Sequence, residues 1–399
     1  MEHIKSRRTL LACLAIMGVG FSVLFPILTP VGRQLGLNEL QITSIIAVSS
    51  LTVFLATPVW GRLSDRLGRK LIILIGLFGF SLGTFLFNII LELGLSEKLS
   101  GVNLFLALLL ARICHASIMS AAMPAATAYM ADITDVGSRT KGMGAAGAAN
   151  NLGSIVGPAL SGLATISLLL PLWLVGLLAF LNGLFALRFL PPSPKRKEKY
   201  KKSFRLRYSD SRILPFMIAG VALFTGFAIV QQTMGFRFQD SLKLTTAETS
   251  AVFGSALVLS AITALISQVF VVQRIKIEPI SLLQIAMPIL IIAFLLMAFS
   301  ETRFPLTMAF GIMGFGMGLA APGLMAGASL AVPAENQGAV AGLAASCGPL
   351  GFTIGPVIGG AIYQFSPMAT YLFAASIYLS LSLFLLRIKK SQIDTKKNS

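Results

Sequence analysis

Charge is scarce in this 399-residue sequence, and acidic charge is the scarcer kind. Only 12% of the residues are charged and 55% are hydrophobic, whereas soluble domains carry about 25% charged residues. The 15 acidic residues avoid the deep parts of the apolar runs. The three cysteines, Cys13, Cys114 and Cys347, have no paired spacing. These shortages argue against a soluble domain, and we expect no disulfide framework, no metal site and no cofactor.

Long apolar runs dominate the rest of the sequence. A helix that crosses a bilayer needs about 20 largely apolar residues. We predict twelve such spans, and therefore an all-α membrane protein, over residues 9–30, 40–60, 71–93, 102–123, 142–165, 170–190, 213–236, 247–272, 280–300, 304–330, 338–362 and 367–387.

The basic residues are distributed unevenly among the predicted loops. Of the 32 Lys and Arg, ten lie in residues 188–212 alone. The alternate loops hold only Arg33, Lys98, Arg237, Lys243 and Arg303. This bias predicts a multi-pass protein of the cell inner (cytoplasmic) membrane with both termini and the central loop in the cytoplasm. We therefore expect the net charge of +17 to set the topology and to contact anionic lipid headgroups in the bilayer. We do not expect it to bind nucleic acid.

The two halves of the sequence repeat one design. Gly157-Pro158 recurs 198 residues later as Gly355-Pro356. Such a repeat predicts two like bundles with a binding site between them. We expect a monomer with an N-terminal six-helix bundle over 1–190, a cytoplasmic basic linker over 191–212, and a C-terminal six-helix bundle with a short cytoplasmic tail over 213–399.

A strongly charged stretch follows the second predicted span. Residues 61–70 read Gly-Arg-Leu-Ser-Asp-Arg-Leu-Gly-Arg-Lys, and we expect a tight turn in which Gly61 and Gly68 adopt backbone conformations closed to other residues. Two weaker motifs accompany it, namely Gly20-x5-Pro26-x3-Pro30 and Gly153-x3-Gly157-Pro158-x2-Ser161-Gly162, in which Ser161 replaces a glycine. In combination these motifs resemble the major facilitator superfamily, and within it the twelve-span drug:proton antiporters.

The resemblance implies a conformational role for the charged stretch. Asp65 would meet the N-terminus of the helix that begins near Gln337, and Arg69 would pair with Asp132 or Asp135. Such contacts, with Arg66 beside them, would hold the outward-facing state and couple it to protons. Alternatively, the stretch only sets topology through its positive charge, and Asp132 is a solvated loop residue.

Arg112 is the only Lys or Arg deep in a predicted span, and His115 follows three residues later on the same helix face. The superfamily keeps an arginine at this place, but its usual Gln-Gly is here His115-Ala116. A central arginine costs ~2.5–3.5 kcal/mol on insertion scales. Either the pair serves an anionic substrate group or a proton relay, or Arg112 is a structural residue bonded to carbonyls and His115 a satisfied core residue.

Two further sets of residues are candidates from their chemistry. Small residues and prolines that allow close packing or bending are Gly153, Gly157, Pro158, Gly355 and Pro356. Polar, aromatic or sulfur-containing side chains that could line a substrate cavity, or simply pack against lipid and neighbouring helices, are Phe21, Phe25, Arg112, Met119, Met123, Asn150, Asn151, Phe227, Gln231, Met313, Met317 and Phe352.

The resemblance, with these residues, predicts a secondary active efflux transporter that exchanges a small amphiphilic drug or metabolite for protons. Because Arg112 has no embedded acid as a counter-charge, neutral or anionic substrates are favoured over organic cations. The alternatives are export of an anionic metabolite such as a carboxylate siderophore, and a sugar or metabolite facilitator without proton antiport. A membrane enzyme is disfavoured, because two histidines and no clustered acids offer little catalytic chemistry.

Overall fold

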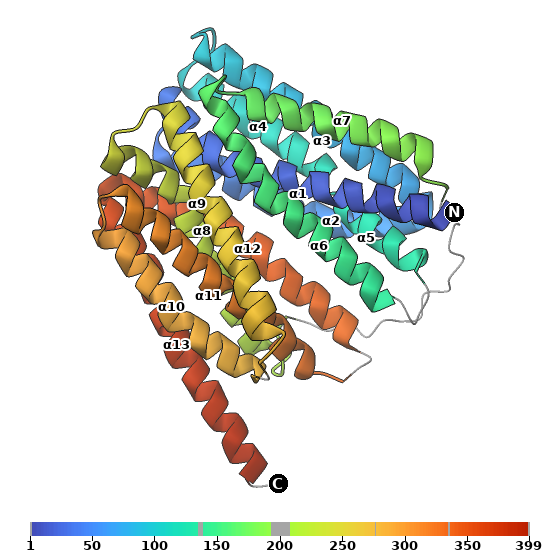
Figure 1. The fold of residues 1–399 in the computed structure, drawn as a ribbon, viewed down its shortest axis with the longest axis vertical. Helices are drawn as coiled ribbons and strands as arrows, with labels where there is room; N and C mark the ends of the chain where they lie inside the picture. The colour runs from blue at the N-terminus through green and yellow to red at the C-terminus, as the bar shows by residue number, and fades with distance from the viewer. Residues whose placement is uncertain (1, 135–138, 193–207, 276, 334–335, 398–399) are drawn as a thin grey trace. The chain divides into compact units, whose positions relative to one another are not determined.

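The computed structural model describes residues 2–134, 139–192, 208–275, 277–333 and 336–397, and over these ranges the chain is helical, without strands. Most of the predicted linker, and Asp135, lie outside the described residues. The helices (Figure 1) are α1 (Glu2–Gln34), α2 (Glu39–Leu67), α3 (Arg69–Leu95), α4 (Gly101–Met119), α5 (Ala122–Asp132), α6 (Arg139–Leu160), α7 (Leu170–Phe189), α8 (Leu214–Leu242), α9 (Thr246–Ser267), α10 (Pro279–Phe299), α11 (Arg303–Leu330), α12 (Gln337–Phe365) and α13 (Pro367–Lys397).

The prediction of a twelve-span helical membrane protein is confirmed. Eleven helical stretches of the described residues are long and apolar enough to cross a membrane, and each corresponds to one predicted span. The remaining prediction, 142–165, corresponds to α6 and a following 3-10 turn, whose Gly-, Ala- and Asn-rich sequence is less apolar. Span 4 is built from α4 and α5. Pro124 has no N–H to bond the carbonyl of Ser120, where the helix is interrupted.

The chain divides into two compact units. The first comprises Met1–Lys199 with Leu244–Ser255, and the second comprises Tyr200–Lys243 with Ala256–Ser399. In the first unit α1 packs along α6 and α7, α3 packs on α4 and α7, and α2 packs on α4 (Figure 1). In the second unit α8 packs along α12 and α13, α10 packs on α11 and α13, and a hydroxyl of α9 bonds α11. The helix pairs therefore repeat from one unit to the other, as the repeated Gly-Pro sequence predicts.

Glycines allow the closest helix contacts in both units. A Cβ on Gly153 would overlap the carbonyl oxygen of Ala15 in α1. The glycine 198 residues later, Gly351, also lies close to α8, where a Cβ would be 2.5 Å from the Phe224 Cβ. These contacts explain why small residues occur at corresponding places, and they give the predicted packing positions a defined physical role.

We expect Gly153→Ala to lower the thermal unfolding midpoint. The added methyl must push α6 away from α1, and overpacking of this kind costs ~1–3 kcal/mol, or on the order of 2–10 °C in a unit of this size. Gly147→Ala in the same helix is the matched control, because nothing lies within 4 Å of a Cβ there. The two purified variants would be compared by thermal unfolding in detergent. Equal midpoints would contradict the close-packing argument.

Two sequence expectations about charged or flexible positions are wrong. Gly61 lies inside α2, which continues to Leu67, because the polar end of a helix can extend past its apolar part. Gly68 alone has the expected left-handed backbone, with φ +100°, between α2 and α3.

Arg237, predicted in an outer loop, lies within α8 and is 9% exposed. Its Nη2 donates to the carbonyls of Ala298 and Ser300 at 3.3 and 2.9 Å, at the C-terminal end of α10. Arg112 is therefore not the only basic residue inside a membrane helix.

Candidate functional site

Arg69 has polar partners in two other helices, α2 and α5. It is the first residue of α3, directly after Gly68, and all three of its guanidinium nitrogens are used. Nη2 lies 2.6 Å from Oδ1 of Asp65, Nε lies 3.2 Å from Oδ2 of Asp132, and Nη1 donates to Oγ of Ser64 at 2.6 Å. We call Ser64, Asp65, Arg69 and Asp132 the Arg69 cluster. The predicted pairing of Arg69 with Asp132 is present.

The Arg69 cluster joins the ends of α2, α3 and α5. The side chain of Arg69 is 12% exposed, whereas that of Asp65 is 47% exposed. Arg66 lies in the last turn of α2, and its side chain is exposed. The predicted contact of Asp65 with the start of α12 joins the two units and stays a prediction.

Arg112 lies in α4 with one polar contact to a neighbouring helix and one within its own. Its Nε donates to Oγ of Ser49 in α2 at 3.2 Å, and its Nη1 lies 2.8 Å from Nδ1 of His115. The guanidinium also lies over the ring of Phe87, 5.5 Å from its centre. The contacts expected of a purely structural arginine were backbone carbonyls. The structure instead surrounds Arg112 with side chains, two of which offer a hydroxyl and an imidazole.

Two glycines leave room for the rings of His115 and Phe80. Gly83 in α3 faces the imidazole, because a Cβ there would be 2.7 Å from Cδ2 of His115. Gly20 in α1 faces Phe80 in the same way, and the Phe80 and His115 rings lie 5.0 Å apart between centres. His115 is 4% exposed, so it is buried as a core residue would be. Its Nδ1 contacts Arg112, whereas its Nε2 has no hydrogen-bond partner among the described residues. Both interpretations of His115 stay predictions.

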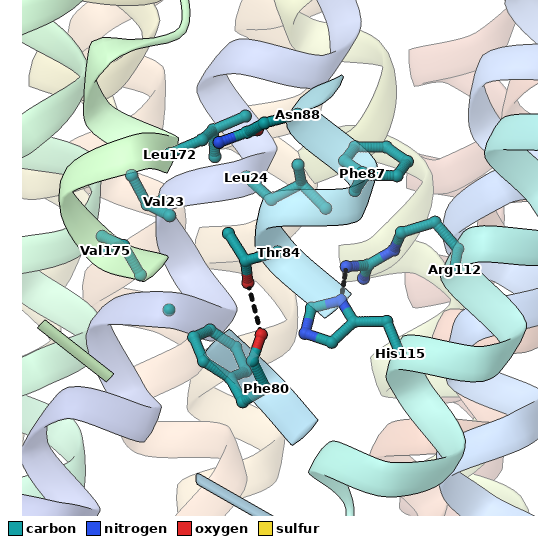
Figure 2. A pocket seen from close by; sticks show the side chains of 11 residues that line it. Val23, Leu24, Phe80, Thr84, Phe87, Asn88, Arg112, His115, Leu172 and Val175 are labelled. Atoms are coloured by element: carbon teal, nitrogen blue, oxygen red, sulfur yellow. Dashed lines mark hydrogen bonds between the residues drawn. The ribbon is translucent and has the colours of Figure 1, made fainter. Parts of the chain in front are cut away.

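A small cavity lies beside this pair in the first unit (Figure 2). It offers about 20 Å³ to the centre of a water molecule. Its walls come from α1, α3, α4 and α7, and none of the lining residues is acidic; they are Gly20, Val23, Leu24, Phe80, Thr84, Phe87, Asn88, Arg112, His115, Leu172 and Val175. Ligand pockets for drug-sized molecules measure about 300–1,000 Å³. This cavity is therefore too small to be the substrate site.

Asn88 is the residue of this site that our sequence analysis missed. It is fully buried in α3, and both polar atoms of its side chain lack a hydrogen-bond partner among the described residues. The sequence did contain a signal, because an amide inside an apolar run needs an interior partner. The predicted cavity-lining residues include the amides of Asn150, Asn151 and Gln231 but no residue of the span over 71–93.

The predicted cavity-lining residues fall into separate places. Arg112 alone among them lines the small cavity. In the first unit the rings of Phe21 and Phe25 pack edge to face at 5.5 Å, and in the second unit Phe227 and Phe352 do so at 6.0 Å. Buried positions are Phe25, Met119, Gln231, Met313 and Met317, half-buried ones are Asn150, Phe227 and Phe352, and exposed ones are Phe21, Met123 and Asn151. The structure assembles aromatic pairs, and the substrate contact of all these residues stays a prediction.

Comparison with known proteins agrees with the sequence resemblance. The family described as Major Facilitator Superfamily matches residues 10–307 and 276–399. Multidrug resistance protein 1 of Bacillus subtilis (strain 168) is 28% identical over 263 residues, which span 64% of each chain. Multidrug resistance protein 2 of the same strain is 25% identical over 93% of this chain and 92% of its own.

Further similarities cover almost the full length. The quinolone resistance protein NorA of Staphylococcus aureus (strain COL) is 24% identical over 96% of each chain. Among solved structures, the nucleoside transporter NupG has a TM-score of 0.76 at 13% identity, with 95% of this chain and 99% of that chain covered. The human organic anion transporter MFSD10 has a TM-score of 0.67 at 18% identity, with 96% and 100% covered. At these identities the structural likeness concerns the fold alone.

Proposed function

Because the chain belongs to the Major Facilitator Superfamily, we propose that it exports a small amphiphilic drug or metabolite in exchange for protons. Membership makes it a multi-pass transporter of small molecules in the inner (cytoplasmic) membrane, not an enzyme. The proposal adds the direction of transport, the coupling ion and the class of substrate, in a monomer whose termini face the cytoplasm.

One observation carries the proposal of export. The likeness to Multidrug resistance protein 2 and to NorA extends over more than nine-tenths of this chain. It therefore includes both bundles, which alternating access requires, rather than a single shared motif. The Arg69 cluster supports the proposal, because it supplies charged contacts at the ends of three helices.

Proton coupling would act through the Arg69 cluster. Protonation of Asp65 or Asp132 would remove one of the two anions that hold Arg69. A proton shifts a conformational equilibrium only if it binds the two states with different affinity. A cluster that is assembled in one state and separated in the other would meet this condition. His115 is a second candidate, since its protonation would place a donor and a positive charge against Arg112.

A second candidate function is export of an anionic metabolite such as a carboxylate siderophore. Arg112 favours it, because the guanidinium contacts a hydroxyl, an imidazole and an aromatic ring, and no carboxylate lines the cavity beside it. A cation inside a membrane bundle attracts anions and repels cations over several ångströms. If transport does not depend on protons, facilitated diffusion replaces antiport as the mechanism.

We expect uphill transport to depend on a pH gradient. The purified protein would be reconstituted into liposomes with a pH dye inside, and a panel of cationic, neutral and polycarboxylate compounds would be offered. Exchange predicts that addition of a substrate moves protons the opposite way and that nigericin, which dissipates the pH gradient, abolishes accumulation. The Arg112→Met variant, reconstituted at equal amounts, is the control for leakage. Accumulation that survives nigericin would refute antiport, and equilibration without accumulation would indicate a facilitator.

A further inference from the structure

The last turn of α7 holds a cation against exposed aromatic rings. The rings of Phe185 and Phe189 lie 4.5 Å apart between centres, and the guanidinium of Arg188 lies 5.5 Å from the centre of the Phe189 ring. All three side chains are exposed, Phe185 to 46% and Phe189 to 40%. A positive charge is therefore placed where the helix ends and its apolar surface begins.

Lys70 brings a second cation to the same place. It is the second residue of α3, and its Nζ donates at 2.9 Å to the carbonyl of Leu187, the residue before Arg188. Carbonyls in the last turn of a helix have no partner inside it and carry the negative end of the helix dipole. An ammonium group has three N–H donors. Two of them remain available to another acceptor beside Arg188.

Neither of these cations is neutralised by the protein. Among the residues that the structure describes, neither Lys70 nor Arg188 contacts a carboxylate. The residue directly before Lys70 behaves differently, because Arg69 contacts both Asp65 and Asp132. Lys70 and Arg188 therefore keep their positive charge for an anion that is not part of the chain.

The start of α1 adds further positive charge at this end of the first unit. Nδ2 of Asn182 in α7 donates to the carbonyl of Ala12 in α1. The start of α1 and the end of α7 lie at the same end of the unit (Figure 1). Arg7 and Arg8 precede Ala12 by about one helical turn, and both are exposed. An anion near Lys70 and Arg188 therefore meets a positive field.

The exposed face of α7 continues away from the cations as an apolar strip. From Arg188 to the far end of the strip is ~16 Å along the helix, close to half of a hydrocarbon core of about 30 Å. A soluble phosphate would use the cations and leave the strip uncovered, whereas a hydrocarbon chain alone would leave the cations unpaired. The strip consists of Leu177, Phe180, Leu181 and Leu184, each 41–50% exposed.

We propose that Lys70 and Arg188 bind the phosphate of an anionic phospholipid whose acyl chain lies along the exposed face of α7. Phosphate oxygens accept from both groups, and the planar guanidinium fork matches a phosphate. A zwitterionic lipid carries its own cation on the headgroup, so its net charge gives two unneutralised cations little to attract. The site does not depend on which substrate is exported or on which ion drives export.

Quenching of a tryptophan at the site by brominated lipid tests the proposal. The chain has two tryptophans, Trp60 and Trp173. Replacing both by Phe and introducing Phe189→Trp leaves one fluorophore, beside Arg188. The full-length protein would be reconstituted into mixed vesicles of phosphatidylcholine and phosphatidylglycerol, with bromine on the chains of one lipid or the other.

We expect phosphatidylglycerol to be preferred at this position on the order of 10-fold, since each basic residue at a bilayer surface contributes about fivefold. The preference should fall about fivefold in Arg188→Gln, and it should disappear when Lys70→Gln is added. Equal quenching by the two brominated lipids would overturn the proposal. A preference that survives in the Lys70→Gln, Arg188→Gln double variant would overturn it as well.

Arg212→Gln is the matched control, because it also removes one positive charge. Arg212 is already paired with Asp210, and no apolar run separates it from the end of α7, so both lie at the same membrane surface. The preference should stay unchanged in this variant. A fall as large as that of Arg188→Gln would reduce the effect to net charge and overturn the site.

The proposal stays testable if the tryptophan variant does not fold. Native mass spectrometry of the otherwise unmodified protein would then compare retention of added phosphatidylglycerol and phosphatidylcholine. We expect the wild-type protein to retain phosphatidylglycerol in preference, and Arg188→Gln to lose most of it. Equal retention of phosphatidylglycerol by the two proteins would overturn the proposal.

Discussion

Arg112→Met is expected to reduce the efflux rate on the order of 100-fold while the protein still folds. The substitution removes hydrogen bonds to Ser49 and His115. Two charge-assisted bonds at ~1.5 kcal/mol each give about 3 kcal/mol, and 1.36 kcal/mol corresponds to a factor of ten. The thermal midpoint should change little, because loss of the bonds is offset by removal of a charge that is costly to bury.

Arg112→Lys distinguishes the geometry of this residue from its charge. Arg112 reaches Ser49 and His115 through two different nitrogens, Nε and Nη1. A lysine has one ammonium group and cannot reproduce a planar fork. We therefore expect the lysine variant to transport at nearly the low rate of Arg112→Met.

Arg237→Lys is the control for buried arginines in general. Arg237 contacts two carbonyls through the single atom Nη2, and an ammonium group can replace a single point donor. Its transport should remain near the wild-type rate. Initial efflux rates, normalised to the amount of protein in the membrane, provide the measurement. A wild-type rate in both Arg112 variants would remove Arg112 from the mechanism.

The helices and their repeat were predictable because each depends on local sequence. About 20 apolar residues suffice to define a span, and Gly157-Pro158 and Gly355-Pro356 mark the same helix in each half. Span ends were less predictable, since apolarity locates the bilayer core and not the last helical turn. Arg237 shows the difference, because a long polar side chain can remain inside α8 and bond the end of α10.

In the candidate site, contacts within one helix were predictable from the sequence and contacts between helices were not. The pairing of Arg112 with His115 follows from their spacing of three along one helix, and the sequence therefore placed them together. Asn88 could not be joined to them from the sequence, because it lies in another helix and the rotation of α3 against α4 is set by packing at Gly83. The contact of Ser161, which replaces the motif glycine, with Ser250 was also not predictable, because the two residues lie in different helices. The Ser161 hydroxyl lies within 2.6 Å of the Pro158 carbonyl and 2.8 Å of the Ser250 carbonyl.

Asp65→Asn is expected to lower the efflux rate about tenfold without destabilising the fold. The Asp65 side chain is 47% exposed, and exposed ion pairs contribute only ~0.2–1 kcal/mol to stability. A bias of ~1.4 kcal/mol between two conformations nevertheless changes their ratio tenfold. Thermal stability and transport should therefore separate in this variant, which a purely structural role for Asp65 would not allow.

Asp210→Asn is the matched control for Asp65→Asn. Asp210 is also an aspartate paired with an arginine, since Nη2 of Arg212 lies 2.8 Å from its Oδ2. Hydrogen bonds from the side chain and backbone of Arg212 lower the pKa of Asp210 to about 2, so this carboxylate stays charged at any pH used for transport. Its loss should leave the rate unchanged, because a group that does not exchange protons cannot couple them. Equal rates for Asp65→Asn and Asp210→Asn would show that the Arg69 cluster sets topology alone.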